Sequence, residues 1–269
     1  MLGGNTPRML PFQRLLTLGL TTATMTTLPA EMPRWTPSDT FFAPEAFQAV
    51  AADSHHIYAI ASRVVAKYDR STKTKIATSR GSAKHLNSGL LLNGKLYCAH
   101  SNYPQKPEIS QIYQLDPASM TLSVFKDFGD YGGSLTWMLR RNNHWWVNFA
   151  YYGEDNHRTY LAKFDEQWNE LNRWTYPPDV ISKLGKYSLS GGVFLGQNLL
   201  VTGHDDPVIF VLRIPDQGDQ LTYLRTESVP FFGQGFAIDP VTKGLVGIRR
   251  NRLQIIVTER DEPWPQNGD

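Results

Sequence analysis

A five-fold internal repeat is the feature that most constrains how this chain can fold. From about residue 45, short segments rich in Val, Ile, Tyr, Phe and Trp alternate with Gly, Asn, Asp and Pro, which is typical of strands joined by turns. The first unit, "AFQAVAADSHHIYAIASRVVAKYDRSTKTKIATSR", contains four such strands. Three further units begin at "NSGLLL", "GSLTWM" and "SGGVFL", and a fifth, beginning at "GQGFAIDP", ends after three strands.

Repeats of roughly 40–50 residues that each form a four-stranded meander predict a β-propeller. We therefore predict an all-β fold of five blades over residues 45–260; six blades is the alternative if residues 30–48 hold more than one strand. A β-sandwich would explain the strands, but not the Asp that ends the third strand of successive units. These residues, interpreted as turn-forming, are Asp69, Asp116 and Asp165.

The missing strand of the fifth unit has a candidate at the other end of the chain. The segment "DTFFAPEAFQ", residues 39–48, precedes the first unit and is predicted to complete the last blade, closing the ring. Residues 31–44 are accordingly expected to hold a linker and the start of this closing strand. Residues 261–269 are expected to form a disordered tail.

The first 30 residues resemble a secretory signal peptide. Arg8 and Arg14 precede a weakly apolar, Thr-rich run that ends at Ala30, where cleavage is expected. The alternative is an unstructured leader. Export predicts a periplasmic or secreted protein, and no later segment approaches the roughly 18 apolar residues of a membrane-spanning helix. We expect a monomer without a membrane span.

Composition argues against two other classes of function. The net charge is +2 and the basic residues are scattered among nearly as many acidic ones, so no basic stripe is present to bind nucleic acid. The single cysteine, Cys98, cannot form an internal disulfide, and its strand-like context "KLYCAH" favours a buried hydrophobe over a nucleophile. The cluster Trp137, Trp145 and Trp146 is interpreted as packing between blades rather than as a sugar-stacking platform.

Polar residues are concentrated on one predicted face of the ring. In each blade, the start of the first strand and the loop between the second and third strands lie on the same face, and the other turns lie on the opposite face. The loops on the first face include "CAHSNYP", "FAYYGEDNH", "TGHDDP" and "GIRRN", whereas the opposite turns, such as Asn93-Gly94, have ordinary turn chemistry. The polar residues should therefore surround a shallow funnel at one end of the central channel.

These residues suggest acid–base chemistry on a polar or anionic ligand. A His near pKa 6.5 can transfer protons, a carboxylate can orient it, and Arg or Asn can hold an anion or a hydroxyl group. The predicted catalytic residues are His100, His204 and Asp205. The predicted ligand-binding residues are His85, Asn87, Asn102, Tyr103, Ser134, Tyr151, Ser190, Gln234 and Arg249.

A bound metal is a weaker alternative. Three His and an Asp would suffice for zinc, but no pair has the short spacing of a known metal motif. No metal ligand is therefore assigned, and the cofactor is unknown. Motifs of the GxSxG, HExxH and Walker types are also absent from the sequence, so no nucleophile is identified.

The segments "HLNSG", "LYCAHSNYP", "WWVNFAYYG", "VTGHD" and "GQGFAIDP" together resemble a family of bacterial, mostly secreted β-propeller proteins often labelled cycloisomerase. The resemblance covers roughly residues 45–250. It implies a propeller similar to the carboxymuconate-lactonising enzyme, with His100, His204 and Arg249 as candidates for binding a carboxylate and moving a proton. Similarity of fold does not transfer the reaction.

Three hypotheses of function follow. The first is an exported propeller whose funnel binds a small polar or anionic molecule and acts as an isomerase or lyase. The second is a non-catalytic propeller that binds a carbohydrate or a protein partner. The third, a quinone-dependent dehydrogenase, is weaker because such sites gather calcium-binding carboxylates. The candidates for that role are only Asp155, Asp205 and Asp206.

Overall fold

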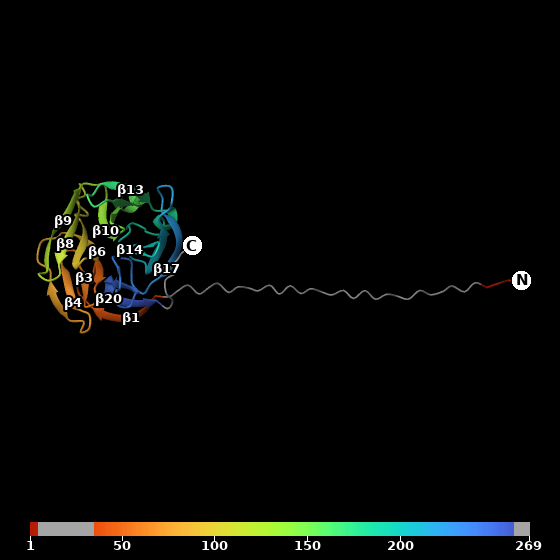
Figure 1. The fold of residues 1–269 in the computed structure, drawn as a ribbon, viewed down its shortest axis with the longest axis horizontal. Helices are drawn as coiled ribbons and strands as arrows, with labels where there is room; N and C mark the ends of the chain where they lie inside the picture. Colours follow the sequence, from red (N-terminus) through yellow and green to blue (C-terminus); the bar gives the residue numbers. More distant parts are fainter. Residues whose placement is uncertain (5–34, 261–269) are drawn as a thin grey trace. The chain divides into compact units, whose positions relative to one another are not determined.

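The computed structural model describes residues 1–4 and 35–260, which contain five four-stranded antiparallel sheets. The sheets form the blades of a ring, with their first strands innermost (Figure 1). This confirms the predicted five-bladed β-propeller. The signal-peptide and tail predictions fall almost wholly on residues 5–34 and 261–269, outside the described residues.

The blades follow one another along the chain. Blade 1 comprises β2 (Ala49–Ala52), β3 (His56–Ile60), β4 (Val65–Asp69) and β5 (Lys75–Thr78). Blade 2 comprises β6 (Leu86–Leu92), β7 (Lys95–Ser101), β8 (Ser110–Asp116) and β9 (Thr121–Gly129). Blade 3 comprises β10 (Ser134–Arg141), β11 (His144–Ala150), β12 (Tyr160–Phe164) and β13 (Glu170–Thr175). Blade 4 comprises β14 (Gly191–Leu195), β15 (Asn198–Thr202), β16 (Val208–Arg213) and β17 (Thr222–Ser228).

Blade 5 is built from both ends of the described segment 35–260. Its strands are β18 (Ala237–Ile238), β19 (Leu245–Arg249), β20 (Gln254–Arg260) and β1 (Trp35–Phe42). β1 pairs antiparallel with β20, from Trp35 opposite Arg260 to Phe42 opposite Gln254. The predicted closing strand is therefore confirmed, although it begins four residues before "DTFFAPEAFQ" and ends at Phe42.

The helices found in residues 35–260 are three, all short and in loops. They are η1 (Gly153–Arg158), α1 (Pro178–Ile181) and η2 (Arg250–Arg252). None of the helices in the described residues has the length and hydrophobicity to cross a membrane.

Apolar side chains between neighbouring blades form the core. The inner strands are buried on both sides because each blade packs against the next, and β10 has six consecutive buried residues. One cluster joins blade 3 to blade 4 through Trp137, Leu161 and Phe210. Trp137, Trp145 and Trp146 are 0–7% exposed, which confirms that they pack in the interior. Cys98 is also fully buried, as its context predicted.

The turns follow the chemistry read from the sequence. Asn93 and Gly94 both adopt positive φ, as a tight hairpin turn requires. The Asp residues that end third strands accept backbone N–H groups two residues ahead. The three acceptor and donor pairs are Asp69 with Ser71, Asp116 with Ala118, and Asp165 with Gln167. Their predicted turn-forming role is confirmed.

Trp35 joins the closing strand to the neighbouring blade. Its ring is 4% exposed and packs in a cluster with Leu200 of blade 4 and Ile256 of blade 5. Its indole Nε1 donates a hydrogen bond of 2.9 Å to Glu227 of β17. Trp35 thus helps to anchor the last blade to the one before it.

We predict that Trp35→Ala lowers the free energy of unfolding by about 3–5 kcal/mol, the usual range for removing a buried aromatic ring. The control is Phe42→Ala at the other end of β1, where the side chain is 63% exposed and a change within about 0.5 kcal/mol is expected. Urea denaturation of both variants tests this. Equal midpoints for the two would contradict the anchoring role of Trp35.

Candidate functional site

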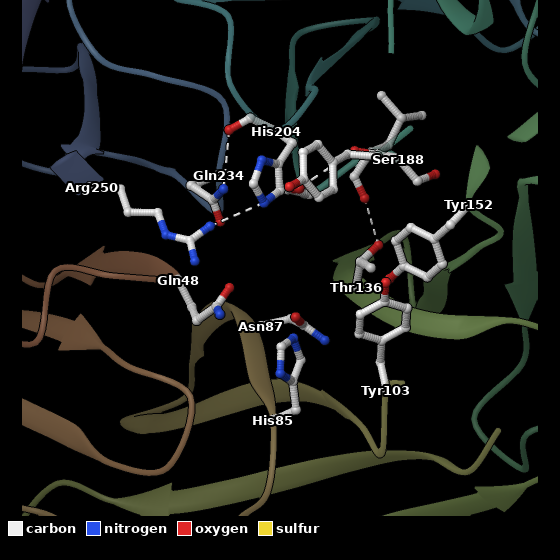
Figure 2. A pocket seen from close by; sticks show the side chains of 13 residues that line it. Gln48, His85, Asn87, Tyr103, Thr136, Tyr152, Ser188, His204, Gln234 and Arg250 are labelled. Carbon is white, nitrogen blue, oxygen red and sulfur yellow. Dashed lines mark hydrogen bonds between the residues drawn. The ribbon is translucent and has the colours of Figure 1, made fainter. Parts of the chain in front are cut away.

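One end of the central channel opens into a small cavity of about 190 Å³, which every blade helps to line. The lining residues come from starts of inner strands, from loops between second and third strands, and from the connection before β14. They are Gln48, His85, Asn87, Tyr103, Thr136, Tyr152, Tyr187, Ser188, Leu189, Ser190, His204, Gln234 and Arg250. Figure 2 shows ten of these residues labelled around the cavity.

His204 is held in one orientation by three neighbours. Its ring stacks on Tyr187, with centroids 3.8 Å apart, and its Nδ1 lies 2.6 Å from a carboxylate oxygen of Asp205. Its Nε2 lies 3.0 Å from Nη1 of Arg250. A guanidinium can only donate, so Nε2 must be the acceptor and the proton of the neutral ring must lie on Nδ1. Asp205 therefore selects the tautomer of His204.

The backbone next to His204 is also fixed. Gln234 donates a hydrogen bond of 3.0 Å to the carbonyl oxygen of His204. Gly233 lies so close to this loop that a Cβ there would be 2.6 Å from the carbonyl carbon of Gly203. Only glycine allows this approach between blades 4 and 5.

Positive charge dominates the cavity. Among the described residues that line it, Arg250 is a cation and none is an Asp or Glu. The Arg250 guanidinium lies 4.0 Å from the centroid of the Phe47 ring and has no carboxylate within ion-pair distance in the described parts of the chain. Burial lowers the pKa of His85, and Arg250 lowers it further. Burial also lowers the pKa of His204, with Arg250 adding to the effect and Asp205 opposing it.

The structure brings together six of the predicted site residues at this cavity. They are His85, Asn87, Tyr103, Ser190, His204 and Gln234. Asp205 does not line the cavity, and its side chain is 68% exposed, but it contacts His204. The other five predicted residues lie elsewhere, for reasons that the local structure shows.

His100 lies within blade 2 rather than at the cavity. Its imidazole is 3% exposed, and its Nε2 accepts a hydrogen bond of 3.1 Å from the backbone N–H of Lys84. Its ring centroid is 4.7 Å from that of Tyr113. Burial above all, with a smaller contribution from neighbouring His85 and Lys84, lowers its pKa to about 4.

The remaining four residues do not line the cavity either. Asn102 bridges the ends of the loop carrying Tyr103, with hydrogen bonds to Pro107 and Ile109. Ser134 is fully buried. Tyr151 lies under the guanidinium of Arg158, and Arg249 donates to the carbonyl oxygen of Pro230. Tyr152 and Arg250, which directly follow Tyr151 and Arg249 in the sequence, line the cavity instead. Successive residues at a strand end point in different directions.

The sequence analysis did not predict Gln48 or Tyr187 as lining residues, and only Gln48 could have been found from the repeats. Gln48 directly precedes β2, and an alignment of the repeats would have placed it near Gln234, which precedes β18. Tyr187 lies in the long connection between β13 and β14, which has no counterpart in the other repeats. No sequence signal pointed to it.

The described residues contain no group of three His, Cys, Asp or Glu side chains that could hold a metal ion.

Burial raises the pKa of the Cys98 thiol to about 12. Because this thiol is buried in blade 2 and stays protonated at neutral pH, it is not a candidate nucleophile.

No protein-family model and no curated protein matches the chain. Among solved structures, a glutaminyl cyclase from Myxococcus xanthus is similar, with 8% sequence identity, a TM-score of 0.56, and coverage of 85% of this chain and 97% of that one. A luciferin-regenerating enzyme is similar with 12% identity, a TM-score of 0.49 and coverage of 85% and 94%. The likeness to the glutaminyl cyclase, with its TM-score above 0.5, supports the β-propeller fold. Membership of the cycloisomerase-labelled family stays a prediction.

The buried imidazoles lead to a pH prediction. Lowered pKa values mean that the fold favours neutral His, while the unfolded chain binds protons near pH 6.5. The resulting contribution to stability is complete above about pH 6.5 and is lost as the pH falls toward 4. We expect His100→Gln, whose amide oxygen can still accept the Lys84 N–H, to reduce this loss by up to about 3 kcal/mol.

Urea denaturation between pH 7 and pH 4 measures the effect. His55→Gln is the control because His55 is exposed, and its acid destabilisation should equal that of the wild type. A His100→Gln variant with the same decline as the wild type would show that His100 is not held neutral by the fold.

Proposed function

We propose that the cavity binds a small hydroxylated carboxylate and that the guanidinium of Arg250 neutralises the negative charge of the bound carboxylate. The observation behind this proposal is a guanidinium that lacks a carboxylate partner within the described residues, in a cavity whose described lining contains no acidic side chain. A partly buried cation without a counter-ion is costly, and a bound anion supplies the missing partner. Arg is also suited to two parallel hydrogen bonds with a carboxylate.

The side-chain amides of Asn87 and Gln234 would accept hydrogen bonds from the hydroxyl groups of the proposed ligand. Asn87 uses its N–H to donate to the carbonyl oxygen of Leu135 at 2.9 Å, and Gln234 uses its N–H on His204. Their carbonyl oxygens therefore remain as acceptors. Hydroxyl groups are neutral donors of the kind these oxygens would bind.

The size of the cavity supports a small ligand. Its volume of about 190 Å³ is below the roughly 300–1,000 Å³ of sites that hold drug-sized molecules. The rings of Tyr103 and Tyr152, with centroids 4.6 Å apart, limit the cavity on one side (Figure 2). A compact acid suits these limits better than a polysaccharide chain does.

The proposed reaction is proton transfer at a carbon next to the carboxylate, as an isomerase or lyase requires. His85 is the proposed base: its lowered pKa favours the neutral form at pH 7, and its imidazole has no hydrogen-bond partner recorded in the described chain. His204, oriented by Asp205, is the proposed second proton carrier. Arg250 would stabilise the negative charge that develops on the carboxylate oxygens when a proton leaves.

Thermal unfolding with small acids tests binding. A hydroxycarboxylate at one hundred times its dissociation constant should stabilise the protein by roughly 2.7 kcal/mol, whereas the matching primary amide should have no effect. Arg250→Gln should abolish the stabilisation. Arg252→Gln, which removes the same charge from an exposed neighbour, should retain it. Equal stabilisation by acid and amide, or binding that survives Arg250→Gln, would contradict the proposal.

Proton exchange tests the chemistry separately. In D₂O, the wild type should replace the hydrogen next to the carboxylate of a bound acid with deuterium, which proton NMR detects as loss of a signal. His85→Gln should slow this exchange by at least about 100-fold, the lower end of a general base's contribution, while the ligand still stabilises the fold. Binding without exchange in the wild type would favour the non-catalytic binding protein.

A further inference from the structure

A second polar groove lies between blades 3 and 4, at the other ends of the strands. It is lined by the β10–β11 turn, the β14–β15 turn and the start of the loop after β16, and its main polar and aromatic residues are Arg141, His144, Trp146, Lys163, Arg213 and Asp216. The first cavity lies where β10 begins, and this groove lies where β10 ends. The two sites are therefore separate.

The charges of this groove are not balanced within the described chain. Arg141, Lys163 and Arg213 have no carboxylate within ion-pair distance there, whereas nearby Arg140 pairs with Glu166. Asp216 is exposed at the rim and forms no ion pair with another described residue. Arg141 donates to Gln197 at 3.0 Å, but the Arg213 side chain makes no hydrogen bond with a described residue.

Buried polar atoms without hydrogen-bond partners beside the groove give an independent indication of a ligand. Trp146 is 7% exposed, and its indole Nε1 has no acceptor in the described chain. The same holds for Nε of Arg213 and for Nδ1 of His144. Buried polar groups without partners are rare and destabilising. Nε1 of Trp146 and Nε of Arg213 can only donate, so these two atoms beside one cationic groove indicate a missing acceptor.

We propose that this groove binds a tetrahedral oxyanion, phosphate or sulfate, either free or as an ester group. Lys163 lies opposite Trp146 on the adjacent strand, and its ammonium is 5.5 Å from the Trp146 ring centroid. Arg213 approaches from β16 of the next blade. Cationic donors from two blades therefore line one groove, and their number suits the several oxygens of a tetrahedral anion better than the two oxygens of a carboxylate.

The competing explanation involves Asn198. This residue is the register partner of Arg213, and its buried Oδ1 also lacks a partner. If Arg213 and Asn198 satisfy each other in solution, the groove has no need of an anion and Trp146 will not respond to one. The experiment therefore uses Trp146 as its reporter.

The experiment is an NMR titration of the indole N–H signals of the full chain, which has seven Trp residues, with the Trp146 signal assigned from Trp146→Phe. Inorganic phosphate and sulfate are added at constant ionic strength maintained with chloride. Methyl phosphate and dimethyl phosphate distinguish a monoester from a diester, and acetate tests a planar anion. We expect the Trp146 signal to shift saturably with phosphate or a phosphate ester and to remain unchanged with acetate.

Arg213→Met and Lys163→Met should each weaken the phosphate-induced shift at least tenfold. Arg63→Met, which removes one charge from an exposed loop, should leave it unchanged, as should Arg250→Gln at the other site. No saturable shift of Trp146 with any phosphate or sulfate would overturn the proposal. A shift that persists in Arg213→Met and Lys163→Met would overturn it as well, and neither result would affect the proposed carboxylate site.

Discussion

The pairing of β1 with β20 is the interaction on which the rest of the structure depends. It joins the two ends of the described segment 35–260 in one sheet and completes blade 5. The innermost strand of that blade, β18, has only two residues, so most of the blade's pairing comes from its three outer strands. Closure of the ring brings Arg250 of blade 5 to the same cavity as His85 of blade 2.

The closeness of the inner strands determines the size of that cavity. A Cβ on Gly192 would lie 2.9 Å from the ring of Trp137, and one on Gly235 would lie 2.5 Å from Ala49. Small residues on the inner strands therefore allow five blades to pack around a narrow axis. The resulting cavity is small, about 190 Å³. For the ligand proposed above, specificity would come from the polar groups that line it.

The two proposed sites use opposite ends of the same blades and the same physical principle. At each site, Arg is placed where the described chain provides no carboxylate for it, although ion pairs such as Arg70 with Asp239 show that the fold can supply one. Arg70 and Asp239 connect blade 1 to blade 5 and have a structural role. The Arg residues without such partners are the ones that a bound anion would neutralise.

Regularities of the sequence were enough to predict the architecture. The repeat length, the Asn-Gly turn and the Asp residues after third strands are local signals, and they identified five blades and the face on which polar loops gather. They also identified Asn87, His204 and Gln234 at the cavity, because each lies at a fixed position in the repeat. The closing strand was predicted from the missing strand, but its bounds were not.

The sequence alone therefore determined the blades, their order and the polar face, since hydrophobic alternation and turn chemistry depend on near neighbours in the chain. Tertiary structure decided which side chain of a pair enters the cavity, Arg250 rather than Arg249 and Tyr152 rather than Tyr151. It also enclosed His100 within blade 2 and brought Tyr187 against His204. These outcomes depend on where a strand ends and how adjacent blades pack, which are properties of contacts distant in sequence.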